Sequence, residues 1–398
     1  MAPVAAQEPR RPAWWLAGLF MAMMANGTDE FVIAGVLPDI SADLAVCAAA
    51  TGQLITVFAV CFALGAPLLA LLTDQLPRRA VLVAALVVFA GANAAAALAP
   101  GYWWLMCARV LAALAAALVA AESFAMAAGA APEGKQGRYL SVVTAGLTVA
   151  LFTGVPIGTF LGGAYGWRSN FWLLAAVGVA VAVLLGAIAP QIPGSQPAPL
   201  AERLAPLRSR PVARLVGTIF LCGSGGLMFY SYLGPITTEF AGGSYQLRGL
   251  VLLLVGVVGV GAVFLGGRVT DVWGPRSARL VVIGGHGVAL LALAAFAFTG
   301  TRSALIFAVL VALWSLFAWA LNPPMQASIL TAAPDAAMTA LALNISGLYL
   351  GTGVAAALGG IVLSLWGVTY IPLVAGLLLL AALGLASMPA AKPPPPTP

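Results

Sequence analysis

Three charged side chains lie inside long apolar stretches of this sequence. Asp29 and Glu30 are adjacent carboxylates in the first stretch, and Arg109 lies within a later one. If these stretches cross a membrane, such charges are costly and functional by default. A carboxylate that alternates between a dry site and a site beside an arginine takes up and releases a proton. The residue types therefore indicate reversible protonation coupled to movement, with a structural ion pair as the alternative.

The helices that carry these charges place them at a similar depth. Asp29 lies eight residues before Leu37, the expected outer end of its helix, which corresponds to ~12 Å. Arg109 lies seven residues, or ~10 Å, from the expected outer end of its own helix at Tyr102. Neighbouring residues on a helix point ~100° apart. We therefore expect one carboxylate to pair with Arg109 and the other to bind protons. Glu122, nearer the inner end of the same helix, is expected at the membrane interface.

Composition identifies the class of protein. Of the 398 residues, 62% are hydrophobic and 8% are charged, whereas about a quarter of an ordinary soluble domain is charged. The mean hydropathy is +1.04. These values exclude a soluble enzyme, a nucleic-acid-binding protein and a disordered chain. The apolar runs exceed the ~20 residues of a membrane-spanning helix and lack the alternation of a barrel strand. We expect an all-α, polytopic membrane protein.

Charges, prolines and glycines divide the chain into twelve apolar segments. They lie near 14–37, 50–73, 79–99, 102–127, 139–163, 168–189, 213–237, 247–268, 278–299, 303–328, 338–365 and 367–388. A proline-rich connection separates six segments from six. We expect an N-terminal cytoplasmic tail (1–12), a six-helix bundle (13–189), a cytoplasmic linker (190–211), a second six-helix bundle (212–389) and a disordered C-terminal tail (390–398).

The basic residues predict the orientation. With the N-terminus in the cytoplasm, 14 of the 18 Lys and Arg fall on the cytoplasmic side. Three fall outside, namely Arg168, Arg248 and Arg302. Both termini are therefore expected in the cytoplasm. The net charge of +6 indicates topology and does not require an acidic partner.

The two halves match at one constant offset of 197 residues. Pro38 matches Pro235, Asp74 matches Asp271 and Arg79 matches Arg276, and the Gly162-Gly163 pair recurs at 359–360. Parallel repeats of this kind occur in transporters that bind substrate between the halves. The repeat predicts two pseudo-symmetric bundles with a central site.

A charged loop motif follows the second segment of each half. The first copy reads Thr73-Asp74-Gln75-Leu76-Pro77-Arg78-Arg79, and the second extends from Gly267 through Asp271 to Arg276. Both resemble the loop motif of the major facilitator superfamily, although the first copy has Ala70, Gln75 and Pro77 where the motif has glycine, a basic residue and glycine. The resemblance implies a conformational latch made by Asp74, Arg78, Arg79, Asp271 and Arg276.

Small residues recur every four positions in the fifth segment. Gly154, Gly158 and Gly162 lie on one helix face, with Pro156 between the first two. Small residues allow another helix to approach closely, and proline removes a backbone hydrogen bond and bends the helix. The pattern resembles the antiporter motif of drug/proton exporters. Plain helix packing is the alternative.

The first segment extends the resemblance. Gly27-Thr28-Asp29-Glu30-Phe31 looks like the first-span pattern of proton-coupled drug and sugar-efflux transporters, and Arg109 resembles their span 4 arginine. The drug/proton antiporter group, which includes chloramphenicol-resistance and arabinose-efflux-like proteins, is the nearest resemblance. It implies alternating access, a proton as the coupling ion, no other cofactor, and Asp29, Glu30 and Arg109 as coupling residues. We expect the protein to be a monomer in a bacterial inner membrane. Its expected cargo is a small amphipathic, drug-like molecule.

Aromatic and polar residues in later segments are candidates for a substrate wall. With Asn26 of the first segment they form the set Asn26, Met228, Phe229, Tyr232, Trp319, Asn322 and Asn344, and Trp314, Gln326 and Tyr349 are further candidates. Packing in the bundle or against lipid is the alternative for each. Asn322-Pro323-Pro324 predicts a bend.

Other functions receive less support from the sequence. A sugar or metabolite exporter or an importer on the same fold stays open, and a channel is disfavoured by the repeat and the loop motifs. One His and four Cys without metal-binding spacing provide neither a metal site nor an enzyme centre. No GxxxxGK[ST] loop indicates ATP as the energy source.

Overall fold

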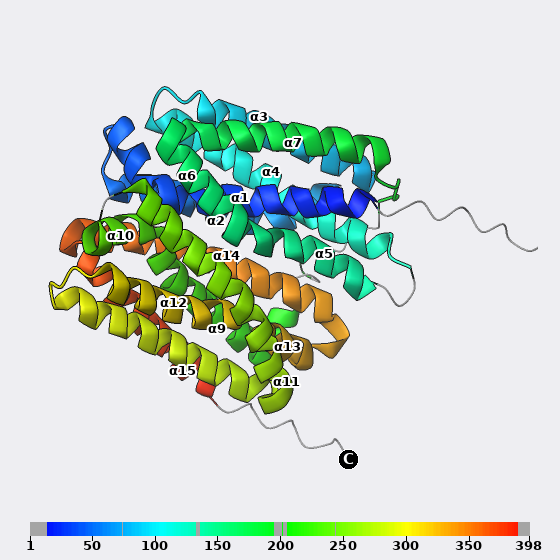
Figure 1. The fold of residues 1–398 in the computed structure, drawn as a ribbon. Helices are drawn as coiled ribbons and strands as arrows, with labels where there is room; N and C mark the ends of the chain where they lie inside the picture. Colours follow the sequence, from blue (N-terminus) through cyan, green and yellow to red (C-terminus); the bar gives the residue numbers. More distant parts are fainter. Residues whose placement is uncertain are drawn as a thin grey trace, which may run out of the picture.

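The computed structural model describes residues 14–73, 75–132, 136–194, 201, 205–242 and 244–388. Every regular element among them is a helix (Figure 1). This confirms the predicted all-α class. The expected tails at 1–12 and 390–398 lie outside the described residues, as does part of the expected linker.

The N-terminal half contains α1 to α7. Their bounds are α1 Trp14–Asp43, α2 Ala48–Thr73, α3 Arg78–Ala97, α4 Tyr102–Gly129, α5 Gln136–Val149, η1 Ala150–Gly154, α6 Val155–Tyr165 and α7 Arg168–Ile188. The segment η1 is a π-helical turn. It directly precedes Pro156, whose missing N–H and bulky ring prevent regular hydrogen bonding to the turn before it. The proline thus divides one expected span into α5 and α6.

The C-terminal half contains η2 to α15. Their bounds are η2 Ala205–Arg208, α9 Arg210–Ser231, α10 Leu233–Ala241, α11 Tyr245–Phe298, α12 Ala304–Ala320, α13 Asn322–Ala332, η3 Pro334–Ala336, α14 Ala337–Trp366, η4 Val368–Tyr370 and α15 Ile371–Ser387. The element α11 is two helices joined at Gly274, whose φ of 77° favours glycine. At the position of the predicted bend, α12 ends at Ala320 and α13 begins at Asn322, although Leu321 between them keeps helical φ and ψ. The bend itself stays a prediction.

Nine helices among the described residues are long and apolar enough to cross a membrane. The fifth expected span is interrupted by η1, and α11 contains two expected spans within one continuous element. The first helix, which carries Asp29 and Glu30, is not among the nine. The count of twelve, the division into bundles at 13–189 and 212–389, and the cytoplasmic location of both termini stay predictions.

The two halves lie one above the other in Figure 1, with α1 to α7 above and α9 to α15 below. They meet where α2 packs on α14, α1 on α10, and α6 and η1 on α11. At the end of the molecule predicted to be periplasmic, Arg248 of α11 pairs with Asp39 of α1 at 3.0 Å. This ion pair joins the halves at that end.

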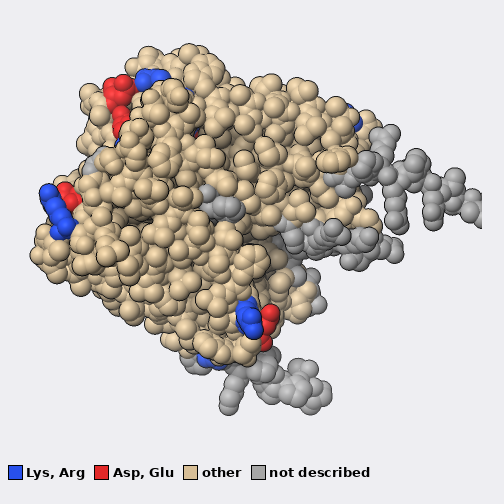
Figure 2. All heavy atoms as spheres, in the orientation of Figure 1, with Lys and Arg blue, Asp and Glu red and all other residues tan. Residues whose placement is uncertain are grey.

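The charged residues at the surface lie near the ends of the helices (Figure 2). In Figure 2 the red and blue atoms lie towards the ends of the visible face, and the surface between them is tan. Exposed large apolar side chains occur throughout the helices, including Val183, Phe264 and Leu305. An apolar belt between charged ends is what a lipid bilayer requires of a protein that spans it.

One of these terminal pairs has a predictable pH dependence. Arg168 and Trp167 donate hydrogen bonds to Asp43, and the bond from Arg168 lowers the pKa of Asp43 below its usual 3.8. A carboxylate with a lowered pKa stabilises the fold above pH 3.8, and this stabilisation is lost as pH falls through the lowered value. Since both side chains are more than a third exposed, we expect Asp43→Asn to cost less than about 1 kcal/mol at pH 7. Melting temperatures of variant and parent should converge below pH 3.8, whereas a constant difference would contradict this assignment.

Candidate functional site

A buried ion pair joins α1 to α4. Arg109 Nη1 lies 2.5 Å from Asp29 Oδ1, and Arg109 Nη2 donates to the main-chain oxygen of Asp29 at 3.2 Å. Neither side chain is exposed. The Arg109 guanidinium also lies over the ring of Phe58, 4.2 Å from its centroid. The predicted agreement in depth between Asp29 and Arg109 is therefore found in the structure.

The hydrogen bonding of this pair is incomplete. Asp29 Oδ2 and Arg109 Nε are buried and have no hydrogen-bond partner among the described residues. Two charges taken out of water are stabilised only when their geometry and hydrogen bonding are good. Arg109 therefore satisfies only one of the two carboxylate oxygens of Asp29.

Glu30 faces a different partner. Tyr349 Oη donates to Glu30 Oε2 at 2.8 Å, and both residues are buried. Because Glu30 belongs to α1 and Tyr349 to α14, this hydrogen bond joins the two halves of the molecule. The ring of Tyr349 stacks on Phe62 of α2, with centroids 4.1 Å apart. The two adjacent carboxylates thus have separate surroundings, as the ~100° between neighbouring residues predicts.

A small cavity lies between the halves beside Glu30. Its space is about 10 Å³, which holds roughly one water molecule. The lining residues are Glu30, Phe31, Ala34, Ile55, Phe58, Ala59, Leu227, Tyr230, Ser231 and Thr352. The Phe31 ring meets Tyr230 and Trp319 edge-on, at 5.4 and 6.4 Å between centroids. A drug-sized molecule therefore cannot enter this cavity unless the halves move apart.

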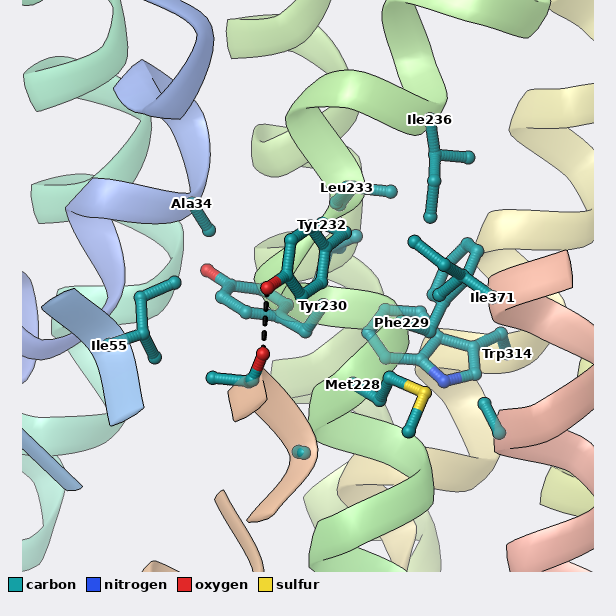
Figure 3. Packing of buried hydrophobic residues seen from close by; sticks show 14 of the residues in the cluster. Ala34, Ile55, Met228, Phe229, Tyr230, Tyr232, Leu233, Ile236, Trp314 and Ile371 are labelled. Atoms are coloured by element: carbon teal, nitrogen blue, oxygen red, sulfur yellow. Dashed lines mark hydrogen bonds between the residues drawn. The ribbon is translucent and has the colours of Figure 1, made fainter. Parts of the chain in front are cut away.

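None of the seven predicted wall residues lines this cavity. On α9 the cavity is lined by Leu227, Tyr230 and Ser231, which occupy one helix face at positions i, i+3 and i+4. The predicted Met228 and Phe229 fall on other faces of α9, and Phe229 packs within the C-terminal half. Tyr232, which follows α9, reaches across to Gly52 of α2 in the N-terminal half. Figure 3 shows Phe229 beside Trp314, and Tyr232 donating to the main-chain oxygen of Ala356 at 2.7 Å.

The other predicted wall residues lie elsewhere. Asn26 donates to the main-chain oxygen of Ala116 on α4, which holds it in the N-terminal half. Asn344 is buried, with its Oδ1 unpartnered among the described residues. Asn322 begins α13, and Trp319 reaches the site only through its contact with Phe31. The cavity is lined instead by Phe31, Phe58 and Tyr230 among others, which the sequence did not single out because apolar and aromatic residues occur on every face of these helices. The predicted substrate wall itself stays a prediction.

The glycine motif packs against α1. A Cβ added at Gly158 would lie 2.5 Å from Val32, and one at Gly162 would lie 2.7 Å from Val36. Gly154 lies in the same way against Thr28. The three glycines therefore contact every fourth residue of α1, the helix that carries Asp29 and Glu30. Residue 154 meets residue 28, residue 158 meets residue 32, and residue 162 meets residue 36. The close packing predicted from the motif is found, and its role in antiport stays a prediction.

This packing predicts an unusual cost for a small substitution. We expect Gly158→Ala to destabilise the protein by about 1–3 kcal/mol, because the added methyl overpacks against Val32 and Asn170. Gly91→Ala in α3 is the matched control, since its Cβ meets nothing within 4 Å and alanine favours a helix. Thermal melting in detergent measures both. Equal melting temperatures for the two variants would show that the α1 contact is not tight.

The structure describes the two loop motifs in part. Asp74 lies outside the described residues. Arg78 pairs with Glu122 of α4 at 3.2 Å, and Arg79 donates to the main-chain oxygen of Ala189. Glu122, expected at the interface, is instead 1% exposed, because Arg78 provides a partner that lets its carboxylate stay buried.

In the second motif Asp271 and Arg276 are accessible to solvent. No ion pair of either residue is present within the described ranges. Their role as a latch stays a prediction.

Comparison with known proteins places the chain in a family. Residues 19–339 match the family model of the Major Facilitator Superfamily. The MFS-type transporter YbcL of Bacillus subtilis is 33% identical over 87% of this chain and 88% of its own. A chloramphenicol resistance protein of Streptomyces lividans is 36% identical over 67% of this chain and 68% of its own. A probable sugar efflux transporter of Helicobacter pylori is 28% identical over 89% and 90%.

A solved structure shares the fold. The crystal structure of a bacterial homologue of the human lysosomal transporter Spinster, in an inward-facing and occupied conformation, superposes with a TM-score of 0.76. It covers 96% of this chain and 97% of its own, at 17% identity. The resemblance to the family that the sequence motifs indicated is therefore confirmed over most of the chain. The chain belongs to the Major Facilitator Superfamily and is a multi-pass membrane transporter, not an enzyme.

Proposed function

We propose that this protein exports a small amphipathic compound by alternating access, driven by protons that move inward. One observation carries the proposal: a buried Asp29–Arg109 ion pair adjoins a Glu30–Tyr349 hydrogen bond that joins the two halves. Ionisable groups buried in a transporter act as ion or proton sites by default. The proton is the only coupling ion proposed, and no cofactor is required.

The arrangement supports a simple coupling scheme. A hydrogen bond from the Tyr349 hydroxyl to an ionised Glu30 is charge-assisted and roughly twice as strong as a neutral one. A proton on Glu30 removes that advantage and loosens the contact between α1 and α14. Release of the proton restores it. Asp29 remains beside Arg109 during both steps, so the N-terminal half keeps a fixed charge pair while Glu30 titrates.

The lining of the cavity supports an amphipathic aromatic substrate. Phe31, Phe58 and Tyr230 supply rings, and Glu30 supplies the single carboxylate of the wall. Pockets lined by aromatic side chains with few polar groups bind such ligands. Recognition of a sugar requires several fixed hydrogen-bonding groups, whereas the other polar side chains of the wall are hydroxyls, including Ser231. Export of a sugar or another metabolite is the second candidate, favoured by the sugar efflux relative.

Expression in a bacterial host that lacks its own efflux pumps tests the proposal. Cells that produce the parent protein should survive higher concentrations of aromatic amphipathic antibiotics and should lose this advantage when the proton gradient is collapsed. Sugar-loaded cells should show no proton-dependent release of sugar. Proton-dependent uptake instead of efflux, or flux that does not saturate, would contradict the proposal and favour an importer or a channel.

The setting proposed for this activity is the inner membrane of a bacterium. The relatives named above come from bacteria. The protein's partners are then the transported small molecule and the lipid bilayer. A single chain contains both halves of the proposed site, so a monomer is sufficient for transport.

A further inference from the structure

A second, larger cavity lies within the C-terminal half, away from the proposed transport site. Its volume is about 290 Å³. It is bounded by the start of α9, the part of α11 that follows the Gly274 kink, the end of α13 and the end of α15. These helix ends lie on the side that the basic residues predict to be cytoplasmic. Nothing in the proposed transport mechanism uses this cavity.

The cavity is basic. Three arginines line it, Arg214, Arg276 and Arg279, together with the hydroxyl residues Thr218, Ser328 and Thr331. No acidic residue is among its described lining residues. Arg276 and Arg279 are three residues apart on one helix, so they lie on the same face and point towards the same space.

Among the described residues, the hydrogen-bond acceptors of Arg279 are neutral groups. Its Nη1 donates to Ser328 Oγ at 2.9 Å and its Nη2 donates to the main-chain oxygen of Ala386 at 3.4 Å. Its Nε is buried and has no hydrogen-bond partner among the described residues. By contrast, the buried Arg109 and Arg248 each meet a carboxylate.

A half-buried guanidinium without a counter-ion is unfavourable, because no attraction to an opposite charge offsets the free-energy cost of removing water from it. The groups that best compensate for it are planar or tetrahedral oxyanions, and phosphate binds arginine with charge-assisted, often bidentate hydrogen bonds. Arg276 and Arg279 together supply the donors for such a group, and the hydroxyls of Thr218 and Ser328 add polar surface.

We propose that this cavity binds a phosphate group, supplied by an anionic phospholipid of the cytoplasmic leaflet. Basic pockets between membrane helices on the cytoplasmic side bind such headgroups. The remaining lining is apolar, with Leu215, Leu385 and Met388 beside the arginines. A phospholipid likewise joins a phosphate to hydrocarbon chains, so it can contact both the arginines and the apolar wall. Free phosphate can contact only the arginines and the hydroxyl groups.

Such a lipid would contact several helix ends of the C-terminal half at once. Arg276 belongs to the second loop motif, and the other lining residues come from α9, α13 and α15. A phosphate shared by these arginines would join the start of α9 to α11. The inference does not depend on which compound is transported.

Thermal stability of the purified protein in a non-ionic detergent tests the proposal. Phosphatidylglycerol, phosphatidylcholine and inorganic phosphate are added separately to the parent, to Arg279→Gln and to Arg276→Gln. Arg302→Gln is the matched control, because it removes the same charge from an exposed pair at the opposite end. We expect phosphatidylglycerol at a hundredfold excess over its Kd to raise the melting temperature of the parent and of Arg302→Gln by about 5 °C.

We expect the two cavity variants to lose at least half of this shift, and phosphatidylcholine to produce little shift in any protein. Arginine-dependent stabilisation by inorganic phosphate alone would support a phosphate site and overturn the lipid as its source. Equal shifts with both lipids, or an unchanged shift in both cavity variants, would overturn the site itself. If Arg279→Gln does not fold, Arg276→Gln provides the same comparison.

Discussion

Arg109→Gln is expected to destabilise the protein by about 3–5 kcal/mol and to abolish proton-driven efflux. The substitution leaves the Asp29 carboxylate buried without a counter-charge, and removal of one partner of a buried pair is strongly destabilising. It also removes the cation that lies over Phe58. Thermal melting in detergent and efflux from energised vesicles measure the two effects.

The double variant Asp29→Asn with Arg109→Gln separates folding from function. Because both charges are then absent, most of the lost stability should return, since neutral replacement of a buried pair is often tolerated. Efflux against a gradient should remain well below the parental rate. A double variant that exports as well as the parent would show that the ion pair is structural and takes no part in coupling.

Glu30→Gln is expected to abolish uphill efflux while preserving downhill exchange of substrate. The amide keeps an acceptor oxygen for the Tyr349 hydroxyl but cannot exchange a proton, so the halves can still meet while coupling is lost. Counterflow and proton-driven efflux in reconstituted vesicles distinguish these activities. Equal proton-driven efflux by Glu30→Gln and the parent would exclude Glu30 as the coupling residue.

Tyr349→Phe tests the same contact from the other half. It removes one hydroxyl and retains the ring that stacks on Phe62. A hydrogen bond to a charged group contributes about 1.5–3 kcal/mol, so its loss should displace the pH profile of efflux by about one to two units. Tyr165→Phe is the control, since Tyr165 is exposed and should leave the profile unchanged. A profile that is the same in all three proteins would mean that Tyr349 does not act on Glu30.

The buried charges and the glycine motif show what can be predicted from the order of residues. The cost of burying charge in a membrane is enough to single out Asp29, Glu30 and Arg109 as candidate functional residues. The glycines at positions 154, 158 and 162 predict that another helix packs closely against their own. Both inferences depend on local periodicity and on depth along a helix, which the order of residues fixes. The substrate wall stays a prediction. Met228 and Phe229 lie outside the small cavity beside Glu30, and they have the same character as the residues on the neighbouring faces of their helix.

The sequence by itself determined a membrane-spanning helical transporter with charges buried in its first and fourth apolar segments. Only the tertiary structure decided that Asp29 meets Arg109 while Glu30 meets Tyr349, 319 positions away in the chain. It also decided that Arg276 and Arg279 share a cavity with Arg214. Composition and periodicity specify what each helix requires of its surroundings. Which helix meets that requirement depends on how segments distant in the chain pack together. Successive residues of a helix point ~100° apart around its axis, so neighbouring residues contact different partners.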